Sequence, residues 1–147
     1  NYHPENSHVI PGLIVRFHNA KKSNDKVVKV WGSGKPKREF LYVDDMADAS
    51  IYLMNLDIVE YHRNTKPMLS HVNIGTGEDL SIKDLSNAIA SEVGYKGIIE
   101  FDTEKPDGSP RKLLDVSCLN NLGWRAKFDL NLGLSLTYKD YLRNLNI

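Results

Sequence analysis

The sequence has little cysteine, no net charge and no long apolar run. Its single cysteine, Cys118, excludes an intrachain disulfide and suits a reducing compartment, so we expect a cytoplasmic protein. The 19 basic residues balance 19 acidic ones, so the net charge gives no reason to expect nucleic acid as a partner. No apolar run reaches the roughly 18 residues that a membrane span needs, and we expect no membrane partner. The five histidines are scattered, and with no cysteine pair they predict no metal site.

The remaining composition is that of a soluble globular protein with one modest core. The chain has 147 residues, of which 41% are apolar and 26% charged. It opens with Asn1-Tyr2-His3-Pro4 and no methionine, so we expect a segment of a longer polypeptide whose partner domain is absent.

Helical and strand patterns alternate along the chain and predict an α/β fold. Apolar residues over 9–20 recur at spacings of three and four, which predicts a helix that Ser7 caps. Residues 27–31 and 40–43 read as strands, and Asp44 or Asp45 caps a helix over 46–56. The other expected elements are a polar connector over 57–69, strands over 71–74 and 98–101, a helix from Ser81 to Gly94, a short helix that contains Cys118 as a packing residue, and a last helix capped within 129–131.

The densest chemical signal lies between Trp31 and Asp45. It combines an aromatic side chain, a turn in which two glycines allow positive φ, and a cluster of cations. This combination predicts the anchor of a site for a phosphate-bearing ligand; the alternative is a solvated hairpin between two strands. The residues concerned are Trp31, Gly32, Gly34, Lys35, Lys37 and Arg38.

Three other stretches are candidates for the same site. His8 and Arg16 are eight residues apart, so on a helix they share one side and lie about 12 Å apart along its axis, a separation that suits a sugar at one end and a phosphate at the other. The loop over 105–112 carries three cations that can close over phosphates. The turn over 75–77 follows an expected strand, where ligands sit in open α/β sheets. Each stretch also has a purely structural alternative. His8 and Arg16 can be ordinary surface residues, the loop over 105–112 can be an exposed loop, and the turn over 75–77 can be a simple connection.

Six segments together resemble one family. They are Ser7 to Pro11, Arg16 to His18, Val30 to Gly34, Arg38 to Met46, Asn73 to Gly77 and Lys105 to Asp115. They are similar to the carboxyl-terminal part of the GDP-L-fucose synthase family, a branch of the extended short-chain dehydrogenases/reductases. The run Arg-Glu-Phe-Leu-Tyr-Val-Asp-Asp indicates only an extended reductase acting on nucleotide sugars, whereas Ser-His-Val-Ile-Pro and Lys-Pro-Asp-Gly-Ser-Pro-Arg-Lys narrow the resemblance to this family.

The resemblance implies a fold and an assembly. It predicts the substrate domain plus the last strands and helices of a Rossmann-like sheet. Residues 1–35 and 78–147 are then mostly substrate-binding domain, and residues 36–77 mostly belong to the dinucleotide-binding sheet. Members of the family are usually homodimers, so the resemblance implies a homodimer of the full-length protein.

The resemblance also implies a function and its residues. The family uses NADPH to convert GDP-4-keto-6-deoxy-D-mannose to GDP-L-fucose by 3,5-epimerisation and 4-reduction, so it is both an isomerase and an oxidoreductase. His8 matches the acid of the epimerisation and is expected to lie beside the nicotinamide of the cofactor. The positions that match substrate-binding residues of the family are Arg16, Trp31, Arg38, Asp107 and Lys112.

Several residues of the family have no counterpart in this sequence. The Gly-rich NADP-binding turn, the Ser and Tyr-x-x-x-Lys of hydride transfer and the cysteine base are missing, so we expect NADPH to be bound mainly by an upstream half and this segment alone to be inactive. Two alternatives remain: another nucleotide-sugar epimerase or dehydratase, which would have no need of a second acid at His8, and a non-catalytic nucleotide-sugar-binding module.

Overall fold

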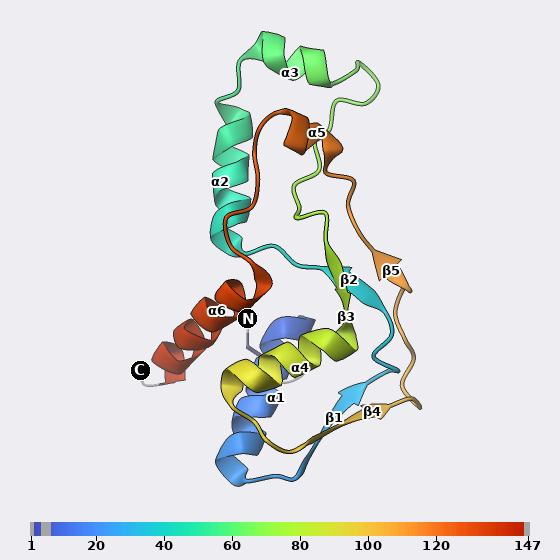
Figure 1. Cartoon of the computed structure of the whole chain (residues 1–147), viewed down its shortest axis with the longest axis vertical. Coiled ribbons are helices and arrows are strands. Elements are labelled where there is room, and N and C mark those ends of the chain that lie inside the picture. The colour runs from blue at the N-terminus through green and yellow to red at the C-terminus, as the bar shows by residue number, and fades with distance from the viewer. Residues whose placement is uncertain (1, 4–6, 146–147) are drawn as a thin grey trace. The chain divides into compact units, whose positions relative to one another are not determined.

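A computed structural model describes residues 2–3 and 7–145, and these residues form a mixed α/β structure. The chain divides into two compact units, which are shown together in Figure 1. Unit 1 comprises Asn1–Lys37, Leu80–Arg111 and Leu134–Ile147, and unit 2 comprises Arg38–Asp79 and Lys112–Gly133. Segment 112–133 therefore packs with segment 38–79, not with the other carboxyl-terminal residues.

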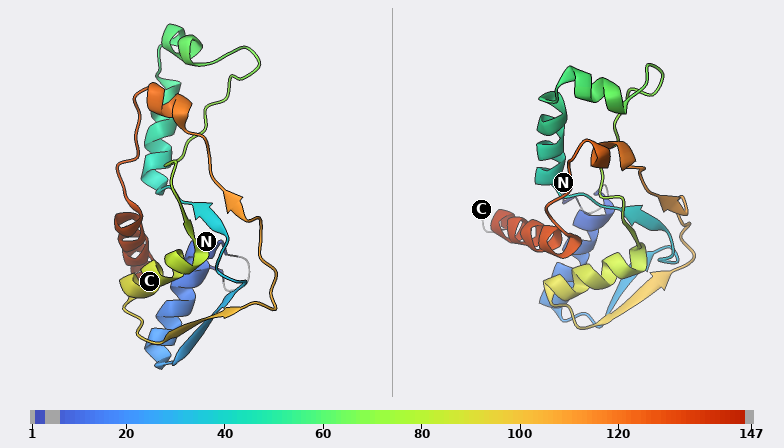
Figure 2. Two further views of the ribbon diagram at one scale, coloured as in Figure 1. Left: turned by 45° about the vertical axis from the view of Figure 1, so that its right-hand side comes forward. Right: turned by 45° about the horizontal axis from the view of Figure 1, so that its top comes forward.

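Unit 1 packs two helices on a pair of parallel strands. Helix α1 (Val9–Ser23) and helix α4 (Ile82–Val93) lie side by side in Figures 1 and 2. Strand β1 (Val27–Trp31) pairs with β4 (Ile98–Asp102), with Val27 opposite Ile98 and Trp31 opposite Asp102. The core consists of buried apolar side chains, each worth roughly 1.5–3 kcal/mol of burial; they include Leu13, Ile14, Phe17, Val28, Val30, Leu85, Ile89 and Val93.

The helix ends of unit 1 follow local capping rules. The Ser81 hydroxyl accepts a hydrogen bond from Asp84 N at 3.0 Å, and α4 ends at Gly94 in the left-handed conformation, as predicted. The predicted cap of α1 is wrong. The helix begins at Val9, so the capping position falls to His8, whose side chain makes no capping hydrogen bond.

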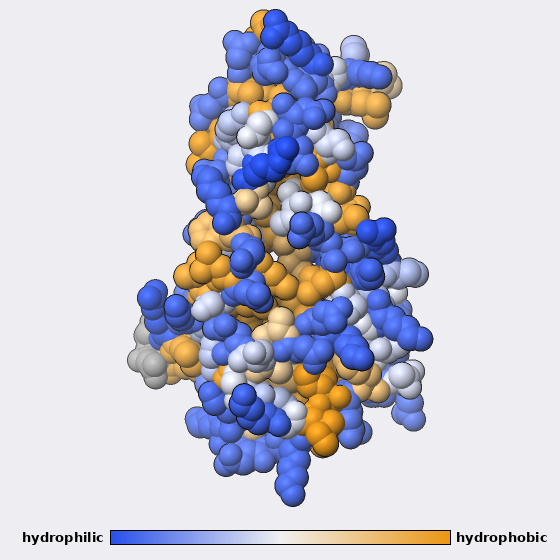
Figure 3. Space-filling model, in the orientation of Figure 1, coloured by the Kyte–Doolittle hydropathy of each residue, from blue (hydrophilic) through white to orange (hydrophobic). Residues whose placement is uncertain are grey.

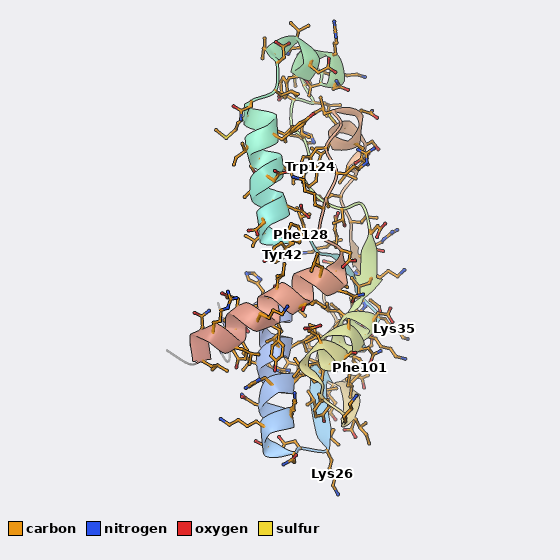
Figure 4. All side chains as sticks on the ribbon, turned by 60° about the vertical axis from the view of Figure 1, so that its left-hand side comes forward. Lys26, Lys35, Tyr42, Phe101, Trp124 and Phe128 are labelled. Carbon is orange, nitrogen blue, oxygen red and sulfur yellow. The ribbon has the colours of Figure 1, made fainter. Side chains whose placement is uncertain are left out.

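Unit 2 is organised around helix α2 (Val43–Met54), with the shorter helices α3 (Ile58–Asn64) and α5 (Ser117–Asn121). Its core contains Ala49, Leu119 and Trp124. The polar side chains at positions 45, 48 and 52 recur at helical spacing and bind the segment over 122–128. Asp48 accepts from Trp124 Nε1 at 2.8 Å, and Figure 4 shows Trp124 beside α2 and Tyr42 against Phe128.

A second sheet has the strand order β3-β2-β5, formed by Asp79–Ser81, Lys37–Glu39 and Arg111–Lys112. Each of these strands includes a point at which the chain passes from one unit to the other. The last helix, α6 (Leu130–Leu145), is capped by Asp129, which accepts from Leu132 N at 2.8 Å, within the predicted range.

Several elements differ from the prediction. Helix α2 begins at Val43, so Asp44 and Asp45 lie in its first turn and neither caps it as predicted. No strand is found over 40–43 or 71–74. The aromatic and β-branched residues there are suited to a strand, but no partner strand pairs with these segments among the described residues. The connector over 57–69 contains α3, because the Asp57 carboxylate caps it by accepting from Val59 N at 2.8 Å. The hairpin alternative for 31–45 is also wrong, since β1 pairs with β4 and β2 lies between β3 and β5.

Polar side chains cover most of the face seen in Figure 3, with apolar patches between them. Among the described helices, none combines the length and the apolar character that crossing a bilayer requires.

Candidate functional site

Trp31 lies at the end of β1 and is 62% exposed. The Arg16 guanidinium carbon lies 5.1 Å from the centroid of its ring, and Lys105 Nζ lies 5.7 Å from it. Cations at these distances are attracted by the negative face of an aromatic ring. Arg16 also donates a hydrogen bond from Nη1 to Lys29 O at 3.3 Å, which orients its side chain along β1. We call Arg16, Trp31 and Lys105 the tryptophan cluster.

Asp107 fastens the cationic loop to the turn that follows β1. Its Oδ1 accepts from Ser33 N at 2.7 Å, and its Oδ2 accepts from Ser33 Oγ at 2.6 Å. These bonds, chiefly the one from the hydroxyl, hold the pKa of Asp107 below its ordinary value. Gly32 is required at this point, because its φ is +83° and a Cβ there would lie 2.5 Å from Asp107 Oδ1. The loop that carries Lys105 is therefore held beside Trp31.

Arg16 lies on α1, whereas His8, predicted in the first turn of the helix, is the capping residue just before it. His8 is the residue before α1 and its side chain is exposed, while its carbonyl accepts a hydrogen bond from Gly12 N at 3.0 Å. Arg16 is half-buried at the middle of α1. The rise of an α-helix places the two residues about 12 Å apart along the axis.

Arg38 and Lys112 belong to unit 2 and lie on neighbouring strands, β2 and β5. The residue after Arg38 is Glu39, whose carboxylate accepts hydrogen bonds from the backbone of the turn over 75–77. The N–H groups of that turn therefore bind a carboxylate of this chain. Of the two interpretations that the sequence allowed, a ligand site and a simple connection, this favours the second.

The predicted site residues thus fall into two groups. Unit 1 contains His8 and brings Arg16 together with Trp31, and Asp107 holds the adjoining loop; unit 2 places Arg38 and Lys112 on adjacent strands. The sequence prediction included Lys105 in the cationic loop over 105–112 but did not place it beside Trp31, and it missed Glu39. Both residues stand inside segments that the resemblance had singled out.

Cys118 lies on α5 and is half-buried. Its Sγ donates to Asn64 O at 3.3 Å, so the thiol takes part in the packing of unit 2, as predicted. Across residues 2–3 and 7–145, no three His, Cys, Asp or Glu side chains are grouped so that they could hold a metal ion.

Comparisons with known proteins agree with the predicted resemblance. The model of the NAD dependent epimerase/dehydratase family matches residues 1–75. A relative from Escherichia coli (strain K12), named GDP-L-fucose synthase, is 56% identical and covers 98% of this chain, which spans 45% of that relative. A relative from Arabidopsis thaliana, named putative GDP-L-fucose synthase 2, is 51% identical over 99% of this chain and 42% of its own length.

A solved structure has a similar fold. It is a GDP-D-glycero-L-gluco-heptose synthase from Campylobacter jejuni in the presence of NADPH. It matches with a TM-score of 0.86 and 32% identity, over 97% of this chain and 49% of its own. The chain therefore spans less than half the length of each of these proteins.

Proposed function

The chain belongs to the NAD dependent epimerase/dehydratase family, and we propose that it forms the substrate-binding part of a GDP-L-fucose synthase. Such an enzyme inverts carbons 3 and 5 of GDP-4-keto-6-deoxy-D-mannose and reduces carbon 4 with NADPH. The observation that carries the proposal is the 56% identity, across 98% of this chain, to the Escherichia coli relative of that name.

The cations of each unit are assigned to the GDP moiety of the substrate. In unit 1, Arg16 supplies a planar guanidinium for the diphosphate, and Trp31 offers an exposed ring for packing on the nucleotide or the sugar. Asp107 is assigned a role in fixing the ligand. Its hydrogen bonds to Ser33 support a contribution through holding the loop that carries Lys105. In unit 2, Arg38 and Lys112 have the same assignment. Binding energy from the diphosphate then orients the sugar for reaction.

His8 is assigned the proton donor of the epimerisation. The protons on carbons 3 and 5 are acidic because the 4-keto group stabilises an enolate, and inversion requires a base on one face and an acid on the other. An imidazole can give up and regain a proton near neutral pH, and the exposed position of His8 before α1 leaves its ring accessible. The base is assigned to a residue outside this chain.

The residues present do not by themselves form an NADPH site. The sequence contains neither a Gly-x-x-Gly-x-x-Gly turn nor a Tyr-x-x-x-Lys pair. We assign NADPH, which supplies the hydride for carbon 4 when bound, mainly to residues outside this chain, with His8 beside it. The 147 residues alone are expected neither to hold NADPH tightly nor to turn over, and a measurable oxidation of NADPH with the keto sugar by this segment would contradict that.

The substrate assignment is tested by the oxidation of NADPH in the full-length protein with GDP-4-keto-6-deoxy-D-mannose. We expect turnover, and we expect Arg16→Ala to raise KM for the sugar nucleotide about tenfold or more, because a charge-assisted contact to the diphosphate is lost. The matched control is Arg63→Ala, an exposed arginine on α3 that pairs with Glu60. Equal rates with the corresponding UDP sugar, or no NADPH oxidation by the wild type, would refute the proposal.

The assignment of His8 is tested separately by following the inversion itself. His8→Asn should abolish the inversion that this acid completes, while the affinity for GDP stays unchanged and the base can still exchange the proton with solvent deuterium without inversion. His62→Asn, at an exposed histidine on α3, is the control. Inversion at the normal rate in the His8 variant would show that another residue is the acid.

A second candidate function is an epimerase or reductase that acts on a different GDP sugar. The observation that favours it is the structural match to a GDP-heptose synthase at a TM-score of 0.86. A comparison of kcat/KM for GDP-linked 6-deoxyhexose and heptose keto sugars distinguishes the two candidates.

The proposal includes a cytoplasmic location and a homodimer of the full-length protein. Light scattering of the purified protein tests the dimer, and fractionation of cells tests the location.

A further inference from the structure

Glu39 ends β2, and its half-buried carboxylate binds two other segments of unit 2. Oε1 accepts hydrogen bonds from Thr76 N at 2.6 Å and from Gly77 N at 2.7 Å. Oε2 accepts from Leu114 N at 2.9 Å. One carboxylate therefore joins β2, the turn over 75–77 and the segment that follows β5.

The turn is shaped around this carboxylate. Successive backbone N–H groups that converge on one point form a concavity that binds anions. Gly77 has a φ of +77°, and a Cβ on the buried Gly75 would overlap Glu39 Oε1. The anion that this turn binds is thus supplied by the protein, and the two N–H groups do not serve a ligand phosphate.

The same carboxylate fixes the backbone next to two cations. Arg38 precedes Glu39 in β2, and because side chains alternate along a strand the two project from opposite faces. Lys112 lies in the neighbouring strand β5, two residues before Leu114. The bonds of Glu39 therefore hold the strand of Arg38 and the chain just after Lys112 in one fixed arrangement.

We propose that Glu39 is a positioning residue that holds Arg38 and Lys112 in the geometry in which they bind the anionic part of the substrate. This inference rests on the proposed function, which assigns both cations to the GDP moiety. Bonds from N–H donors to a carboxylate are stronger than those to a neutral acceptor. A glutamine at this position keeps one acceptor oxygen but turns an NH2 group towards a backbone donor, so the arrangement loosens.

The experiment compares Glu39→Gln with Glu78→Gln in the full-length protein. Glu78 is an exposed glutamate directly after the same turn, so it is a matched control for the loss of charge. For the Glu39 variant we expect KM for the sugar nucleotide and Kd for GDP to rise about tenfold, with kcat within about twofold and KM for NADPH unchanged. Hydrogen exchange of the Thr76, Gly77 and Leu114 amides should become faster.

A second variant distinguishes the loss of the positioning role from a general failure to fold. Gly75→Ala leaves the charge of Glu39 in place but displaces its Oε1, so KM for the sugar nucleotide and the amide exchange should move in the same direction as in Glu39→Gln. Glu78→Gln should change neither quantity.

Each possible result of these measurements tests a different step of the inference. Unchanged KM and GDP affinity with faster amide exchange would overturn the positioning role, and unchanged exchange would overturn the binding of the turn by the carboxylate. An equal rise in KM for NADPH would indicate general damage and also overturn the role. If the wild type fails to bind GDP, the proposed function fails and the positioning role with it, while the exchange rates still decide whether Glu39 holds the turn.

Discussion

Asp45 is a fully buried carboxylate in the first turn of α2, and its replacement by asparagine should weaken unit 2 severely. Its two oxygens lie 3.1 Å from Lys127 N, and its Oδ2 lies 3.0 Å from Phe128 N. Asparagine keeps the shape of the side chain, but it removes the charge from these bonds and places an NH2 group against Lys127 N.

The expected loss in the free energy of unfolding follows from the number of backbone N–H groups that Asp45 accepts from. Hydrogen bonds to charged groups contribute roughly 1.5–3 kcal/mol each, against about 1 kcal/mol for neutral pairs, and a buried donor left without an acceptor costs roughly 1–3 kcal/mol. With two backbone donors affected, we expect Asp45→Asn to lower the free energy of unfolding by about 3 kcal/mol. That is a large part of the roughly 5–15 kcal/mol that stabilises a typical domain.

The assay is equilibrium unfolding of the full-length protein in urea. Asp44→Asn is the control, because Asp44 stands in the same first helical turn and is exposed. Like Asp45, Asp44 interacts favourably with the N-terminus of the helix, which contributes less than about 1 kcal/mol. Unlike Asp45, it is not buried. If the two variants lose the same free energy within about 0.5 kcal/mol, the buried bonds of Asp45 do not contribute as argued.

Three further outcomes are expected. Gly34→Ala should lower the free energy of unfolding by more than about 1 kcal/mol in thermal melts, because φ is +74° and a Cβ would lie 2.5 Å from the Phe101 ring; full stability would contradict the geometry. Leu85→Ala, in the core of unit 1, should lower it by about 2–5 kcal/mol in urea, and a loss below about 1 kcal/mol would show that the site is not packed as described. The pKa of Asp107 is lowered in the folded state, so its contribution is present above its ordinary value of 3.8 and is lost as the pH falls through the lower folded value. The fall in stability between pH 5 and pH 2 should therefore be shallower in Ser33→Ala, and equal slopes would argue against the bond.

The helices could be predicted where their signals are local. Ser81 and Gly94 bound α4 through contacts within one helical turn of each end, so a single pass along the sequence finds them. The segments over 40–43 and 71–74 show the limit of such signals. Aromatic and β-branched residues indicate that a segment can form a strand, but only pairing with a partner strand makes it one, and no described strand pairs with these segments.

The site could be predicted in part for the same reason. The resemblance supplied Arg16 and Trp31, which the structure brings within 5.1 Å between the guanidinium carbon and the ring centroid. Glu39 was missed, although it stands inside a segment that the resemblance covers. Its donors are 37, 38 and 75 residues away, and no spacing within a segment shows such a contact.

The two units stabilise their glycine turns in the same way. In unit 1 the Asp107 carboxylate binds the turn after β1, and in unit 2 the Glu39 carboxylate binds the turn before β3; in each case a glycine leaves the space that the carboxylate fills. Because the backbone N–H groups that bind these carboxylates are satisfied, they do not serve a ligand anion. Under the proposed function, side-chain cations then hold the diphosphate, so local cationic clusters supply the positive charge although the net charge of the chain is zero. In that proposal the two carboxylates order the backbone and the cations bind the substrate.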